Sequence, residues 1–331
     1  MKRKLISIIN ILILIIMAIL AIFFLKPKDI ETDSSKIQVV ATIFPNYDFA
    51  KKIGGDKADV TLLLASGVES HTYEPSPKDM IKIEESDIFI YTGDEFEAWA
   101  KNILDSITNP IEVVDTSKNI NLINIEEFEE KNINSEIIND EESHRLDHEE
   151  SSFDSHIWLN PKNAITMIDD CVQAFCKVDP KNSNYYKKNA EKYKIEILEL
   201  DSKFEKLVEN SKTKELAFAG EFAYTYFIER YNLKFISVYN NCGEGQEPSI
   251  AKIKSVIDYI NNHHLPVVFY EELSEGTVAK MIDNETSAKS LVFYSLHNAD
   301  TEKDSYISLM KENYKVLEEA LNWWAFWKLK I

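Results

Sequence analysis

Eight short apolar runs, rich in Val, Ile and Phe, recur along the 331-residue chain in two groups of four. The first group is IQVVATIF, DVTLLL, DIFIYTG and IEVVDTS (residues 37–117), and the second is ELAFAG, KFISVY, PVVFYEE and SLVFYSL (215–296). Runs without alternating polar residues are typical of parallel strands that are covered by helices on both faces. The pattern predicts an α/β protein with two similar lobes, each a mostly parallel four-stranded sheet flanked by helices.

A continuous helical pattern, residues 182–210, separates the two groups of strands. Its apolar positions recur at spacings of three and four, which predicts one buried stripe on a single helix: Tyr186, Ala190, Tyr193, Ile197, Leu200, Phe204 and Leu207. No glycine or proline interrupts it, and a helix of about 27 residues is roughly 40 Å long. We expect one stiff backbone helix that joins the lobes and limits how far they can hinge.

The N-terminus carries a hydrophobic segment of a length that can span a bilayer. Basic residues 1–4 precede residues 5–25, which are apolar apart from Ser7 and Asn10, and a span needs roughly 20 such residues. The positive-inside rule places the rest of the chain outside the cytoplasm. We predict a membrane anchor at residues 1–26 and a polar linker at 27–36, with a cleaved signal peptide as the alternative.

The formal net charge of −19 argues against nucleic-acid binding, which requires clustered Lys and Arg. It is compatible with the capture of cations, although acidity alone selects no metal. Residues 126–155 are especially acidic and include His144 and His148, so we expect a long exposed loop that makes only weak metal contacts. The three cysteines have no regular spacing, which argues against a disulfide framework.

Two histidines precede predicted helix starts. His71 lies in SGVESHTYEPSPKDM, where Ser76, Pro77 and Asp79 form a helix-capping pattern after the strand DVTLLL. His156 lies in DSHIWLNPKNA, next to apolar Ile157 and Trp158, before a similar Asn-Pro entry. Each histidine on its own has an ordinary interpretation as loop polarity, but an imidazole in apolar surroundings also suits a metal ligand.

Together the two segments resemble hallmark segments of the metal-binding solute receptors of zinc and manganese ABC importers. Three more stretches match in order: ATIFPNYDFAKKIGGDKADV (41–60), YTGDEFEAWA (91–100) and SYISLMKENYKVLEEAL (305–321). The resemblance covers residues 37–321. It implies two α/β lobes on a long backbone helix, with one metal ligand from each of four segments in the cleft between them.

The resemblance implies that His71 and His156 are the ligands of the N-terminal lobe. It places Glu221, in EFAYTYFIERYNL, where most zinc receptors have histidine and manganese receptors have glutamate. A carboxylate is a harder ligand than imidazole and shifts preference toward Mn²⁺ without excluding Zn²⁺. The other interpretation of Glu221 is an acid that complements the dipole of the following helix.

The resemblance implies a fourth ligand after the last strand, in SLVFYSLHNADTEKD. His297 is the best donor by type, with Asp300 and Tyr294 as alternatives. Glu244 and Glu247 could also enter the cleft.

With these features, the resemblance implies an extracytoplasmic, membrane-anchored receptor that captures Zn²⁺, or alternatively Mn²⁺, and delivers it to a permease with a cytoplasmic ATPase. We expect a monomer. The alternatives are a cell-surface metallohydrolase that uses the same His/His/Glu set and an adhesin with a structural metal, although the chain has no HExxH or GxSxG motif. We divide the chain into the anchor or signal segment (1–26), the linker (27–36), an N-terminal lobe (37–181), the connecting helix (182–210) and a C-terminal lobe (211–331).

Overall fold

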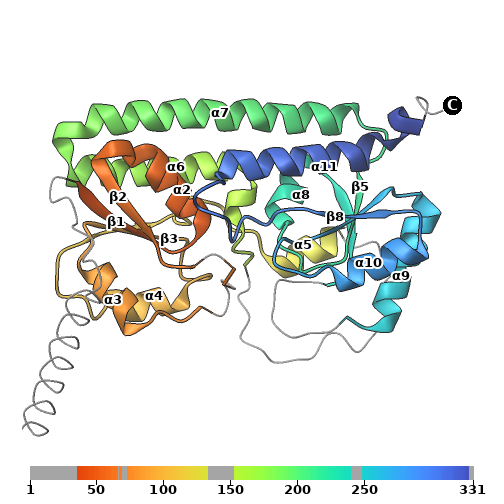
Figure 1. Ribbon diagram of the computed structural model, residues 1–331, viewed down its shortest axis with the longest axis horizontal. Helices are drawn as coiled ribbons and strands as arrows, with labels where there is room; N and C mark the ends of the chain where they lie inside the picture. Colours follow the sequence, from red (N-terminus) through yellow and green to blue (C-terminus); the bar gives the residue numbers. More distant parts are fainter. Residues whose placement is uncertain (1–35, 66, 69–72, 133–152, 240–247, 328–331) are drawn as a thin grey trace, which may run out of the picture. The chain divides into compact units, whose positions relative to one another are not determined.

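Two four-stranded parallel sheets form the framework of the protein (Figure 1). The computed structural model describes residues 36–65, 67–68, 73–132, 153–239 and 248–327. Residues 37–331 group into one compact unit, distinct from residues 1–36. The lobe boundaries given above remain a prediction.

Both sheets have the same strand order, β2-β1-β3-β4 in the first and β6-β5-β7-β8 in the second. The strands are β1 (Ile37–Ala41), β2 (Ala58–Leu62), β3 (Ile88–Tyr91), β4 (Glu112–Asp115), β5 (Glu215–Phe218), β6 (Lys234–Ser237), β7 (Val267–Tyr270) and β8 (Lys289–Val292). All pairings are parallel, which confirms the predicted fold class. The strand order reverses between β1 and β3 in the first sheet and between β5 and β7 in the second. Open α/β sheets bind ligands at such a point, beyond the carboxyl ends of the strands.

Helices connect the strands. They are α2 (Phe44–Gly54), α3 (Pro77–Glu84), α4 (Ala98–Leu104), α5 (Ile125–Asn132), α6 (Pro161–Val178), α7 (Ser183–Asn210), α8 (Thr225–Tyr231), α9 (Ile250–His263), α10 (Thr277–Glu285) and α11 (Tyr306–Trp327), with 3₁₀ turns η1 (Gly55–Lys57), η2 (Ile157–Leu159) and η3 (Pro180–Asn182). The predicted caps are present: Ser76 and Asp79 form a capping box at α3, and the Asn160 side chain accepts a hydrogen bond from the Lys162 amide at α6.

The connecting helix α7 is a single helix of 28 residues, as predicted. All seven residues of its apolar stripe are buried. The helix packs on α2, α6 and α11, and Figure 1 shows it running along these helices on the side away from the sheets.

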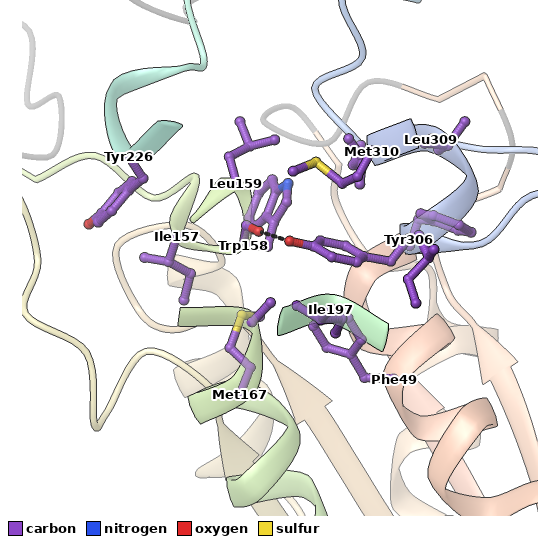
Figure 2. Close-up of a cluster of buried hydrophobic side chains, with 14 of the residues drawn as sticks. Phe49, Ile157, Trp158, Leu159, Met167, Ile197, Tyr226, Tyr306, Leu309 and Met310 are labelled. Carbon is purple, nitrogen blue, oxygen red and sulfur yellow. Dashed lines mark hydrogen bonds between the residues drawn. The ribbon is translucent and has the colours of Figure 1, made fainter. Parts of the chain in front are cut away.

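One hydrophobic core is shared by both halves of the chain. The cluster includes Val39 and Ile88 of the first sheet together with Phe218 and Phe269 of the second. Figure 2 shows its centre, where the Tyr306 hydroxyl donates a 2.8 Å hydrogen bond to the carbonyl oxygen of Trp158. Because close-packed cores resist deformation, the shared core limits relative movement of the two sheets.

The prediction of a continuous exposed loop over residues 126–155 is wrong at both ends. Its first residues belong to α5, where Phe128 is buried and stacks on Phe235 with ring centroids 5.8 Å apart. At the other end Asp154 is also buried. The prediction followed the acidic composition of the segment and gave no weight to Phe128, the aromatic residue that packs α5 on the core. Residues 133–152, including His144 and His148, lie outside the described residues.

In the part of the chain that the structure describes, no helix has both the length and the apolar character needed to cross a bilayer. The anchor predicted for residues 1–26 lies outside that part.

Candidate metal centre

His156 is buried at the entrance to η2, and Asp154 fixes its orientation. Oδ1 of Asp154 lies 3.0 Å from Nδ1 of the imidazole and accepts a 2.8 Å hydrogen bond from the His156 amide. Burial raises the pKa of Asp154, but the adjacent His156 and its hydrogen bonds outweigh burial and hold the pKa below its ordinary value. The carboxylate is therefore ionised at neutral pH. It orients the ring so that Nε2 is the nitrogen that would bind a metal.

His297 is buried in the second half of the chain and is oriented by Ser295. The Ser295 hydroxyl lies 2.8 Å from Nδ1 of His297, which again makes Nε2 the nitrogen that would bind a metal. The Glu272 carboxylate holds this segment, because it accepts hydrogen bonds from the amides of Ser295 (2.7 Å) and Leu296 (3.0 Å) and from the Ser295 hydroxyl (3.0 Å). Burial raises the pKa of Glu272 to about 7.

The two imidazoles lie against each other. Their ring centroids are 4.7 Å apart and the ring planes meet at 66°. Phe96 stacks on His297 with centroids 6.0 Å apart, and Trp158 lies edge-on to both histidines at 5.5 and 5.4 Å. The pair therefore has an aromatic collar, which lowers the local dielectric and strengthens the attraction between a metal and its ligands.

Hydrogen bonds join the segment that carries His156 to the second half of the chain. Trp158 donates from Nε1 to the carbonyl oxygen of Ser295 (2.8 Å), and the Tyr226 hydroxyl donates to the carbonyl oxygen of Asp154 (2.9 Å). These bonds keep the His156 segment in a fixed register with the second half of the chain.

Glu221 lies just beyond the carboxyl end of β5. A methyl group added to Gly220 would meet the Glu271 carboxylate and would lie 3.1 Å from the Glu271 backbone nitrogen, so the two chain segments pass close to each other here. Helix α8 begins only at Thr225, so Glu221 is not in its first turn and the helix-dipole interpretation fails.

The structure describes three of the four predicted ligands, because His71 lies outside the described residues. It brings His156 and His297 together. Within the described ranges, no group of three or more His, Cys, Asp or Glu side chains is close enough to hold a metal ion, so Glu221 does not complete a three-ligand set with this pair.

Of the alternatives for the fourth ligand, Asp300 pairs with Lys303 at 2.5 Å within its own turn, and His297 is the one that contacts His156. Glu244 and Glu247 lie outside the described residues. His263 ends α9, with Nδ1 2.6 Å from a carboxylate oxygen of Glu215, and His264 is the left-handed residue that follows the helix, so both have structural roles at its end.

The sequence reasoning missed the residues that orient the histidines. The predicted acidic loop includes Asp154, which stands two residues before His156. Ser295 stands two residues before His297, and this shared spacing of a polar acceptor was the available signal. No sequence pattern around Phe96 predicts that its ring stacks on His297.

Comparison with known proteins gives a consistent result. The family model described as the periplasmic zinc-uptake complex component A (ZnuA) matches residues 39–320. The chain is similar to the high-affinity zinc uptake system protein ZnuA of Bacillus subtilis, with 31% identity over 296 residues that cover 88% of this chain and 89% of that protein.

Two solved structures have the same fold. The metal-dependent lipoprotein YcdH from Bacillus subtilis matches with a TM-score of 0.71 and 30% identity, over 86% of this chain and 99% of that chain. The Zn(II)-bound ZnuA-like domain of Streptococcus pneumoniae AdcA matches with a TM-score of 0.70 and 25% identity, over the same shares of the two chains.

Proposed function

The chain belongs to the ZnuA family of zinc-uptake components, and we propose that it captures Zn²⁺ through His71, His156, Glu221 and His297 and hands it to a permease. Its relatives are zinc-uptake binding proteins rather than enzymes, so the chain is a solute-binding component and the metallohydrolase alternative is set aside. The metal is cargo, bound and released unchanged.

The contact between His156 and His297 is the observation that carries this proposal. The two imidazoles come from different halves of the chain, lie 4.7 Å apart and have Nδ1 engaged by Asp154 and Ser295. Two rings with Nε2 as the ligating nitrogen suit zinc, which binds histidine nitrogen at about 2.0–2.1 Å.

The donor set supports zinc as the principal cargo. Three imidazoles and one carboxylate provide four ligands of the types that structural zinc sites use, and softer nitrogen ligands favour Zn²⁺ over Mn²⁺. Glu221 is the one hard ligand of the proposed set and accounts for any retained binding of Mn²⁺. Because the described structure does not group Glu221 with the two histidines, its ligation requires a local shift when the metal binds.

The receptor works outside the cytoplasm, as the periplasmic description of the family and the lipoprotein relative support. We place it at the membrane through residues 1–26, as a monomer that docks on a permease whose ATPase drives uptake. The core shared by the two sheets supports small rearrangements at loops, rather than wide lobe closure, as the change that metal binding causes.

Metal analysis of the purified chain tests the proposal. The wild type should bind one Zn²⁺ that outcompetes Mn²⁺. His156→Ala and His297→Ala should each weaken zinc binding at least about 100-fold, because each removes a direct ligand and even the loss of a residue that only orients a ligand costs about 10–100-fold. His263→Ala is the matched control, since this histidine pairs with Glu215 and should leave zinc binding unchanged.

Two results would contradict the proposal. One is zinc binding that survives loss of both His156 and His297. The other is unfolding of the protein when metal is removed, as expected of an adhesin with a structural metal rather than of a receptor that cycles between empty and loaded forms.

A further inference from the structure

The side chain of Asn298, the residue after His297, spans the two halves of the chain. Its Oδ1 accepts a 2.7 Å hydrogen bond from the Gly67 amide. Its Nδ2 donates to the carbonyl oxygens of Ala65 (3.2 Å) and Val68 (3.0 Å). Asn298 is buried, whereas the three backbone groups that it bonds belong to exposed residues, so the bonds lie partly shielded from water. The amide thus makes three bonds to one turn that lies more than 200 residues away in the sequence.

The backbone groups of Ala65, Gly67 and Val68, the described residues of this turn, match the amide. The Val68 amide donates to the carbonyl oxygen of Ala65 (3.1 Å), and Gly67 has a φ of +83°, a conformation that glycine adopts at little cost. The turn follows β2, at the carboxyl edge of the first sheet. Its backbone presents one donor and two acceptors to Asn298, and among the side chains of similar size only an amide supplies one acceptor and two donors.

The segment that carries Asn298 is held firmly on its other side. Glu272 binds the amides of Ser295 and Leu296, and Leu296 itself has a φ of +63°. His297 thus lies between Leu296, which is held by Glu272, and Asn298, which is held by the 65–68 turn. If Asn298 shifts, His297 and its contact with His156 shift as well.

We propose that Asn298 is a positioning residue for zinc capture: it sets the distance between the 65–68 turn of the first lobe and the His297 segment of the second. The inference rests on the proposed function, because it assumes that zinc binds at His297. Without the Asn298 amide, the 65–68 turn and the His297 segment lose the three hydrogen bonds that hold them together. Zinc binding must then also order the ligands, which lowers the affinity.

Zinc affinity, measured by competition with a chromogenic chelator, tests this role in the full chain purified in detergent. Asn298→Ala removes all three bonds, and Asn298→Asp keeps the size of the side chain but places a carboxylate against two carbonyl oxygens. Each should weaken zinc binding about tenfold, the lower end of the range for residues that orient metal ligands, and should raise the rate of zinc release. If Asn298→Ala does not fold, Asn298→Asp provides the test.

Asn46→Ala is the matched control. Asn46 is also a buried asparagine, and its side chain bonds to Thr92 and Thr116, both in the first half of the chain. It should lower the melting temperature but leave zinc affinity within about twofold, because it positions no ligand.

Zinc affinities of both Asn298 variants within about twofold of the wild type would overturn the inference while leaving the proposed function intact. A shift of the same size in Asn46→Ala would also overturn it, since the effect would then reflect general stability. Absence of stoichiometric zinc binding by the wild type would instead overturn the proposed function, and this inference with it.

Discussion

The indole nitrogen of Trp158 donates a 2.8 Å hydrogen bond to the carbonyl oxygen of Ser295, and this bond joins the two segments that carry His156 and His297. Trp158 is fully buried, and its own carbonyl oxygen accepts from the Tyr306 hydroxyl. The indole thus has two functions: it is part of the collar around the imidazoles and it ties the two halves of the chain together.

Trp158→Phe retains an aromatic ring but removes the donor. We expect the free energy of unfolding to fall by about 1–3 kcal/mol, because a buried carbonyl group loses its partner, and zinc affinity to fall with it. Urea unfolding and chelator competition measure the two effects. Trp99→Phe, at a half-buried tryptophan that packs on Tyr73, is the control and should change neither quantity by as much. Equal effects of the two substitutions would show that the Trp158–Ser295 bond has no special role.

Asp154→Asn keeps the shape of the side chain next to His156 but removes its charge. A carboxylate partner fixes the ring and raises the basicity of the ligating nitrogen, so we expect zinc affinity to fall by about tenfold. Competition titrations at neutral pH measure it. Asp169→Asn is the control, because Asp169 pairs with Lys194 instead of a histidine. Unchanged zinc affinity in Asp154→Asn would show that the carboxylate has only a structural role and does not affect zinc binding at His156.

The elements that local patterns determine could be predicted from the sequence. Eight apolar runs became eight strands, the stripe from Tyr186 to Leu207 became the buried face of α7, and both proline-containing helix starts formed as expected. Each of these features depends on neighbours within a few residues in the chain.

The arrangement around the histidines could be predicted only in part. His297 could be ranked by donor type, but its contact with His156 depends on how the two sheets pack on the shared core. The positions of Phe96 on His297 and of Asn298 on the 65–68 turn depend on the same packing, and no local pattern encodes them.

Glu221→His tests whether the carboxylate sets the preference between metals. Exchange of a hard oxygen ligand for imidazole should raise the ratio of zinc to manganese affinity by about tenfold or more. Competition between the two ions, followed by metal analysis, measures this ratio. Glu275→His is the control, since Glu275 is exposed at the turn before α10. An unchanged ratio in Glu221→His would mean that Glu221 does not set the preference.

The buried carboxyl of Glu97 predicts a pH dependence of stability. Its Oε2 accepts hydrogen bonds from the amides of Thr92 (2.8 Å) and Gly93 (3.2 Å), and its Oε1 accepts from the Thr42 hydroxyl (2.5 Å). Burial outweighs these bonds and raises the pKa of Glu97 to about 8. An unfolded glutamate has a pKa of about 4.3, so between pH 5 and 8 the folded protein holds a proton that the unfolded chain has lost.

Stability conferred by that proton is present at low pH and is lost as the pH rises toward 8, with a slope of at most about 1.4 kcal/mol per pH unit for one group. Glu97→Gln cannot ionise and should flatten this slope. Urea unfolding of the metal-free wild type and variant at pH 5, 6, 7 and 8 measures it, and the difference between the two proteins isolates Glu97 from the other titrating groups. Parallel curves for the two proteins would mean that Glu97 is ionised in the folded state, with its three hydrogen bonds outweighing the cost of burial.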